Sequence, residues 1–219
     1  MVMLDQPHLR TVVSALAQKL DSLGIDYALM GGAAVCLLAP NPNRKTEDVD
    51  LVIHVDQRMI TADQLTQRLL EGFPNDFGPV SQFGHTIPAF KLQLPGGVVH
   101  LVELEVFDYQ SWPQRPQYNI PTASRTTINI DGQAVKVFGP EWLLREKILS
   151  QYQRQGSAKE RVDVRDISNL IPLAVSGKPE LDFNQNEDLQ TALAHLVRNR
   201  PALVEALKAK IKCTTVFQN

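Results

Sequence analysis

The chain has 219 residues, 43% of them hydrophobic, and its 22 basic and 24 acidic residues give a formal net charge of -2. This balance excludes a global positive field that attracts nucleic acid without specificity, so a nucleic-acid substrate would need a local basic patch. Cys36 and Cys213 are too far apart in sequence to indicate a disulfide framework or a metal site. No run approaches the ~18 apolar residues of a membrane span, and the first residues lack the apolar segment of a signal peptide. We therefore expect a soluble, cytoplasmic protein without a membrane partner.

The first 139 residues alternate between helical and β patterns. Apolar residues recur at helical spacing in three segments, and six shorter apolar runs are bounded by Gly, Pro, Asn or Asp. Helices are predicted over 9–23, 33–39 and 61–70, and strands over 27–30, 48–55, 89–94, 98–107, 126–130 and 134–138. The turns "PGG" and Asp131-Gly132 predict two hairpins. Residues 72–88 and 108–121 are rich in Pro, Gly and polar residues and predict irregular loops.

After Pro140 the pattern becomes helical. Helices are predicted over 141–155, 158–171, 187–197 and 201–212, separated by breaks such as Gly156, Pro172 and Pro201. The chain therefore predicts an α/β (α+β) domain over residues 1–139, followed by a C-terminal helical region over residues 140–219 that packs on it.

The segment "RKTEDVDLVI" (44–53) places two acidic residues in an otherwise apolar strand. Side chains alternate along a strand, so Asp48 and Asp50 project together from one face. Adjacent carboxylates repel each other, and a divalent cation between them relieves the repulsion. Mg²⁺ suits this role because it takes oxygen ligands from one or two carboxylates and completes its shell with water and substrate phosphates. The alternative is that both aspartates lie at the exposed start of a strand and only increase solubility.

Two neighbouring features favour the metal site. Gly31 and Gly32 end a strand and open a helix, which leaves backbone N–H groups at a positive helix terminus where a phosphate can bind. A tight strand-to-helix turn is the alternative explanation for these glycines. Glu103 and Glu105 share one face of the strand predicted over 98–107 and offer a third carboxylate for the same metal.

These segments, together with "GPEWLLREKIL" and "RVDVRDISNL", resemble the nucleotidyltransferase fold superfamily, which includes DNA polymerase β-like enzymes. The chain is particularly similar to AbiEii-like and related nucleotidyltransferase-like proteins. These show Gly-Gly, then Arg-x-Thr-x-Asp-x-Asp, a strand carboxylate and a helix with an internal lysine. The resemblance covers residues 25–170 and implies a mixed β-sheet flanked by helices.

The resemblance implies a role for each matching residue. The implied metal-binding and catalytic residues are Asp48, Asp50 and Glu105, with Glu103 as the alternative third carboxylate. The residues that the resemblance implies for binding the nucleotide and its phosphates are Gly31, Gly32, Arg44, Thr46 and Lys147. The alternatives are that Arg44 and Thr46 are plain turn residues, and that Lys147 pairs with Glu141 or Glu146 on a solvated helix face. The third acid is a glutamate, one methylene longer than the aspartate of many superfamily members.

The implied activity is Mg²⁺-dependent transfer of a nucleoside monophosphate group from an NTP to an unidentified acceptor, with two Mg²⁺ ions at the three carboxylates. One alternative is a catalytically repurposed protein that binds a nucleotide, a metabolite or a partner protein. Another is an AbiEii-like toxin-type transferase that acts on RNA or protein. ATP or another NTP is the expected donor, and nucleic acid is the less favoured partner.

Two further groups of residues lie outside the metal motif. Asp163 and Asp166 lie three apart on one face of a predicted helix, where they are expected to pair with Arg161 and Arg165 and fix helix packing. Trp112, which shares an irregular loop with Tyr109 and Tyr118, is expected to be a packing anchor. The alternative is that this loop lines the mouth of a substrate site.

Overall fold

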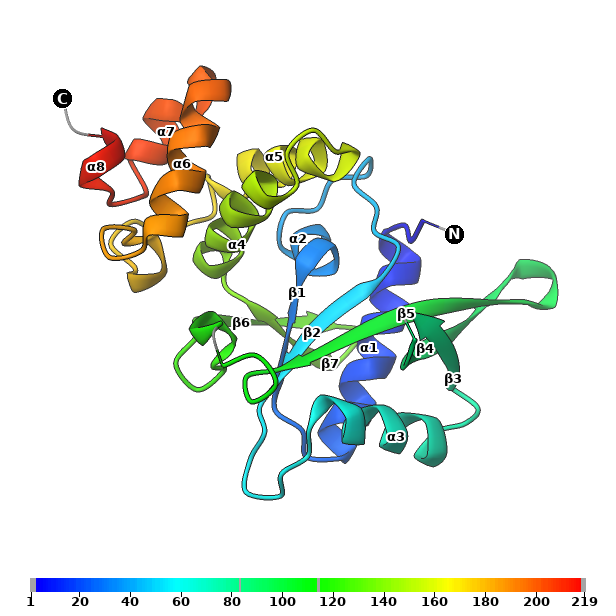
Figure 1. Cartoon of the computed structure of the whole chain (residues 1–219). Coiled ribbons are helices and arrows are strands. Elements are labelled where there is room, and N and C mark those ends of the chain that lie inside the picture. Colours follow the sequence, from blue (N-terminus) through cyan, green and yellow to red (C-terminus); the bar gives the residue numbers. More distant parts are fainter. Residues whose placement is uncertain (1–2, 83, 114, 218–219) are drawn as a thin grey trace. The chain divides into compact units, whose positions relative to one another are not determined.

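The computed structural model describes residues 3–82, 84–113 and 115–217. It divides into two compact units, unit 1 (Met1–Phe138) and unit 2 (Gly139–Asn219). Unit 1 holds the β-sheet with its helices, and unit 2 is helical (Figure 1). No helix in the described ranges combines the length and apolar character that crossing a bilayer requires.

Unit 1 alternates between helices and strands, as the sequence pattern predicts. Its helices are α1 (Gln6–Ser22), α2 (Gly31–Leu38) and α3 (Ala62–Gly72), with short 3₁₀ turns at Pro95–Gly97 and Pro116–Tyr118. Its strands are β1 (Tyr27–Met30), β2 (Val49–Ile53), β3 (Phe77–Gln82), β4 (His85–Leu94), β5 (Val98–Asp108), β6 (Arg125–Ile130) and β7 (Gln133–Phe138).

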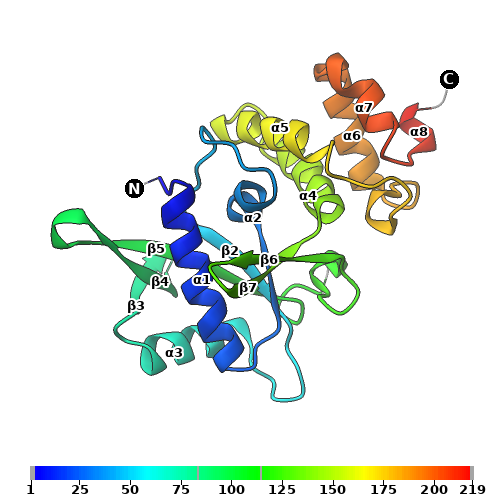
Figure 2. The same ribbon diagram turned by 180° about the vertical axis from the view of Figure 1, so that it is seen from behind.

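In the described residues, seven strands form one sheet in the order β3-β4-β5-β2-β1-β7-β6. The sheet is mixed, because β2 pairs in parallel with β5 and β1 pairs in parallel with β7, while the other neighbours are antiparallel. Figure 2 shows α1 running across the sheet. The predicted α/β class with a mixed sheet flanked by helices is confirmed.

Local sequence signals explain the start of α1 and the β6–β7 turn. Asp5 caps α1, since its carboxylate accepts a hydrogen bond from the backbone N–H of His8 at 3.0 Å. Asp131 and Gly132 have φ values of 52° and 90°, which a two-residue hairpin turn of the I′ type requires. The predicted β6–β7 hairpin is therefore confirmed.

The loop predicted over residues 72–88 is wrong, because this segment contains β3 and the start of β4. Gly78 and Pro79 made the segment look irregular, yet both pair with β4, where Pro79 lies opposite Pro88. Proline lacks a backbone N–H and is tolerated on an edge strand. Since β3 is at the edge of the sheet, its outer backbone groups need no strand partner.

Unit 2 has a core built on one long helix. Its helices are α4 (Pro140–Gln153), α5 (Ala158–Leu170), α6 (Glu187–Asn199), α7 (Val204–Lys208) and α8 (Thr214–Phe217), with 3₁₀ turns at Pro179–Leu181 and Pro201–Leu203. Trp142, Leu144 and Ile148 of α4 are fully buried, and α4 packs against α5 and α6.

The single helix predicted over residues 201–212 is wrong in extent. A 3₁₀ turn precedes α7, and α7 ends at Lys208. Lys212 then forms an isolated parallel bridge with Asp182, and its backbone N–H donates to the carbonyl of Leu181 at 2.9 Å. A tertiary contact therefore takes the backbone hydrogen bonds that a longer helix would use.

Candidate active site

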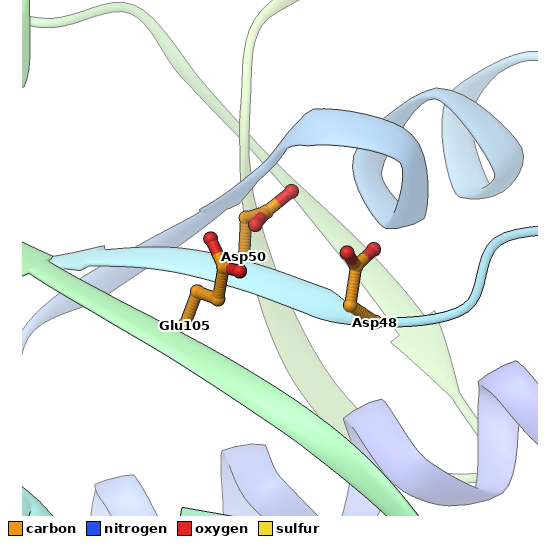
Figure 3. Close-up of side chains that lie close together, drawn as sticks. All are labelled: Asp48, Asp50 and Glu105. Carbon is orange, nitrogen blue, oxygen red and sulfur yellow. The ribbon is translucent and has the colours of Figure 1, made fainter. Parts of the chain in front are cut away.

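Two neighbouring strands bring three carboxylates together in unit 1. Asp50 of β2 lies directly opposite Glu105 of β5 in a parallel pair, and Asp48 precedes β2 with its side chain on the same face. One carboxylate oxygen from each residue lies within 4.8 Å of the others, and all three residues are half-buried. Figure 3 shows the three side chains on the side of the strands where α2 begins.

The structure groups Glu105, rather than Glu103, with the two aspartates. The β2–β5 register sets Glu105 beside Asp50, whereas Glu103 lies opposite Ala89 of β4. Both glutamates share a face, but a shift of two residues moves a side chain by about 7 Å along a strand. Register therefore distinguishes two residues that the strand periodicity leaves equivalent.

The three carboxylates supply only hard oxygen donors, which suits Mg²⁺. Mg–O bonds of ~2.1 Å place two ligands of one ion at most about 4.2 Å apart, and a pair of ions about 3.5–4 Å apart accepts a slightly wider set. Donor atoms within 4.8 Å of one another fit one or two such ions. Asp48, Asp50 and Glu105 are therefore the residues that would hold them.

Gly31 allows the start of α2 to contact the acidic cluster. Its φ of 65° is unfavourable for other residues, and a Cβ built on it would lie 1.8 Å from Oδ2 of Asp50. The N-terminus of a helix carries partial positive charge, which favours a nearby anion. The missing side chain thus leaves room for a carboxylate beside the helix start.

The absence of a side chain at Gly32 likewise leaves room for the loop before β2. A Cβ on Gly32 would lie 2.6 Å from the hydroxyl of Thr46 and 3.0 Å from a guanidinium nitrogen of Arg44. Both side chains are buried. The Thr46 hydroxyl donates towards Oδ1 of Asp48 at 3.2 Å, and Arg44 donates to the carbonyl of Lys45. Arg44 and Thr46 therefore pack on the glycine turn, and Thr46 supports the position of Asp48.

Lys147 is buried inside unit 2, so the solvated helix face that we considered for it is wrong. Its ammonium lies 2.7 Å from Oδ1 of Asp163 and 2.9 Å from Oδ2 of Asp166, and only 7% of Lys147 is exposed. Arg154 lies 3.1 Å from the other oxygen of Asp163. The two aspartates therefore have a packing role, as the sequence predicts. They pair with Lys147 and Arg154, and these pairs link α4 to α5.

Gln82 is a polar neighbour of the cluster that the sequence reasoning missed. Its side-chain N–H₂ donates to Oε1 of Glu105 at 3.1 Å and to Oε2 of Glu103 at 3.3 Å. The residue ends β3, inside the segment that the sequence predicts as a loop. To predict that Gln82 lies beside these glutamates, the segment "FGPVSQ" would have to be recognised from the sequence as an edge strand.

The end of β5 and the loop after it carry a row of aromatic rings. Phe107 shares the face of Glu105 and contacts Tyr118, with ring centroids 5.9 Å apart. The guanidinium of Arg115 lies 5.7 Å from the rings of both Tyr118 and Trp112. Tyr118 is buried, whereas Trp112 is 40% exposed. Trp112 is therefore an exposed ring at the end of this row and not the buried packing anchor that the sequence predicts.

The buried carboxylate of Asp108 anchors the start of this loop. It accepts hydrogen bonds from the backbone N–H groups of Ser111 at 2.5 Å and of Ala62 at 2.8 Å. The loop therefore leaves β5 in a defined direction, three residues after Glu105.

No family model matches the chain, and no curated protein matches it. Among solved structures, an antigenic nucleotidyltransferase-like protein from Paracoccidioides brasiliensis shares 72% sequence identity over 100% of both chains, with a TM-score of 0.96. The antibiotic-resistance factor ANT(2'')-Ia shares 15% identity over 92% of this chain and 97% of its own, with a TM-score of 0.51. The second match is a similarity of fold.

Proposed function

Because the chain belongs to the nucleotidyltransferase-like proteins of the nucleotidyltransferase fold superfamily, we propose that it transfers a nucleoside monophosphate group from an NTP to an acceptor. We propose that the reaction depends on Mg²⁺. The observation that carries the proposal is the convergence of Asp48, Asp50 and Glu105, whose carboxylate oxygens lie within 4.8 Å of one another. Carboxylates this close repel one another, and a bound cation would offset that repulsion.

The three carboxylates have separable roles in this proposal. Asp48 and Asp50 would hold the metal. When bound there, Mg²⁺ would supply positive charge that offsets the charge of the triphosphate and of the leaving pyrophosphate and that favours ionisation of the attacking group. Glu105 reaches the cluster from the neighbouring strand, where its carboxylate would help to hold the metal and would accept the proton of the attacking hydroxyl or amine.

The start of α2 is the proposed position of the nucleotide phosphates. Gly31 and Gly32 open the helix next to the cluster, and the first N–H groups of a helix, which have no acceptor within it, favour anions there. Arg44 and Thr46 pack against this turn and supply donors close to Asp48. For Lys147 we propose a structural role, because phosphate binding would compete with its two ion pairs in unit 2.

The test measures pyrophosphate release from each NTP in the presence of Mg²⁺ and a pool of candidate acceptors. Asp48→Asn and Asp50→Asn keep the shape of the side chain and remove its charge. We expect each to lower turnover by a factor on the order of 10² to 10³, as loss of one electrostatic stabiliser does. Glu71→Gln, at an exposed position of α3, is the matched control and should leave turnover unchanged.

Two results would contradict the proposal. Turnover that survives in both aspartate variants would remove the catalytic role of the cluster. Calorimetric binding of an NTP without pyrophosphate release in any acceptor pool would indicate a binding protein on the same fold.

A further inference from the structure

Gln82 links the two glutamates of β5 through one carboxamide group. The distances from its nitrogen are 3.1 Å to Oε1 of Glu105 and 3.3 Å to Oε2 of Glu103. A carboxamide has two N–H donors, so it can serve both carboxylates at once. Hydrogen bonds to ionised acceptors are roughly twice as strong as neutral ones.

This contact crosses a whole strand. Gln82 belongs to β3 and the glutamates to β5, and β4 lies between these strands in the sheet. Adjacent strands are ~4.8 Å apart, so two backbones separated by a strand are about 10 Å apart. Only long side chains on both sides span this gap. Glutamine on β3 and glutamate on β5 meet that requirement, whereas asparagine or aspartate would fall short.

The contact also reduces the repulsion between neighbouring carboxylates. Glu103 and Glu105 project from the same face of β5 and repel each other, as do Glu105 and Asp50. A donor between the two glutamates offsets part of that repulsion and restricts the rotation of both carboxylates. Ligand carboxylates that are hydrogen-bonded by a neighbouring residue are held in the orientation that the metal needs.

We propose that Gln82 is a positioning residue that orients Glu105 for metal binding. The inference rests on the proposed metal site at Asp48, Asp50 and Glu105. Gln82 does not touch the metal or the substrate in this proposal. Gln82 acts through Glu105. Through this contact the edge strand β3, which does not pair with β2, supports the metal site.

The experiment measures Mn²⁺ binding by the full-length protein, using the electron paramagnetic resonance signal of free Mn²⁺ and no nucleotide. Gln82→Leu keeps the approximate volume and removes the donor, and Gln82→Asn keeps the donor but shortens its reach. We expect Mn²⁺ affinity to fall by about 10-fold to 100-fold in both variants, the usual effect of losing a residue that supports a metal ligand. Gln93→Leu, at an exposed position of β4, is the matched control and should bind Mn²⁺ as the unmodified protein does.

A second readout separates positioning from a general loss of structure. If Gln82 acts through metal affinity, raising the Mg²⁺ concentration should restore turnover of Gln82→Leu, because the apparent Mg²⁺ constant changes more than kcat. Thermal unfolding of Gln82→Asn checks that a folded variant carries the effect. Unchanged Mn²⁺ affinity in both Gln82 variants overturns the positioning role while leaving the proposed function intact. Absence of Mn²⁺ binding in the unmodified protein overturns the metal site itself, and the positioning role with it.

Discussion

A carboxylate oxygen of Asp50 occupies the space that a side chain on Gly31 would need, since a Cβ built there would lie 1.8 Å from Oδ2. Real Cβ contacts are not that short, so any side chain at this position must displace Asp50 or move the start of α2. The glycine also has a φ of 65°, which costs other residues about 1–2 kcal/mol. Gly31 is therefore a structural requirement of the acidic cluster.

We predict that Gly31→Ala abolishes measurable Mn²⁺ binding and lowers NTP turnover as strongly as Asp50→Asn, because the added methyl group displaces the Asp50 carboxylate. The measurement is a Mn²⁺ titration of the purified variant. Gly72→Ala, at the last residue of α3, is the control, because its Cβ would meet nothing within 4 Å. Normal Mn²⁺ binding by Gly31→Ala would show that α2 can shift without loss of the site.

Replacement of Lys147 tests whether its role is structural. Lys147→Met leaves Asp163 and Asp166 buried without their shared cation, so we expect the free energy of unfolding to fall by ~3–5 kcal/mol. Urea unfolding of isolated variants measures this loss. Adding Asp163→Asn and Asp166→Asn to Lys147→Met should recover part of it, because the buried charges are removed with their partner.

The control for this prediction is Lys159→Met, at an exposed position of α5, which should leave the unfolding free energy nearly unchanged. A Lys147→Met variant of normal stability that has lost NTP turnover would reverse our assignment. That result would favour the triphosphate-binding role that the family resemblance implies.

The ion cluster around Asp26 predicts a defined pH dependence of stability. Burial raises the pKa of Asp26, but hydrogen bonds from Arg125 at 2.7 Å and Lys136 at 2.8 Å outweigh it, and the pKa lies below its ordinary value. A lowered pKa in the folded state stabilises the protein above the unfolded value of ~3.9, and this contribution is lost as pH falls through the folded pKa.

We therefore expect Asp26→Asn to be less stable than the unmodified protein at neutral pH, by no more than about 1 kcal/mol because the cluster is partly exposed. The difference in unfolding free energy should shrink as pH falls below about 4. Chemical unfolding at a series of pH values measures both quantities. A difference that stays constant down to pH 2 would show that the charge of Asp26 does not cause it.

The exposed ring of Trp112 tests whether the loop after β5 contacts a substrate. A ring that stacks on a planar substrate group contributes ~1–3 kcal/mol, so Trp112→Ala should raise the KM of that substrate by about 5-fold to 150-fold with little change in kcat. Trp112→Phe keeps an aromatic face and should recover most of the affinity. KM values that are unchanged for the NTP and for the acceptor would restrict Trp112 to its contact with Arg115.

Several parts of this protein follow from local sequence. The alternation of side chains in a strand places Asp48 and Asp50 on one face whatever their neighbours are. Asp131-Gly132 specifies a hairpin because few other residues accept its backbone angles. Gly31 marks the start of α2 for the same reason, since its φ is 65°. Each of these features depends on residues only a few positions apart.

Contacts between distant segments decided the rest. The choice of Glu105 over Glu103 depends on the parallel register between β2 and β5, and a period of two residues cannot distinguish them. Gln82 reaches Glu105 only because β3 pairs with β4 at the edge of the sheet, a pairing that Gly78 and Pro79 conceal in the sequence. Periodicity thus determined which face each acidic side chain occupies, whereas the pairing of strands decided which of these side chains meet, because register is a property of two segments and not of one.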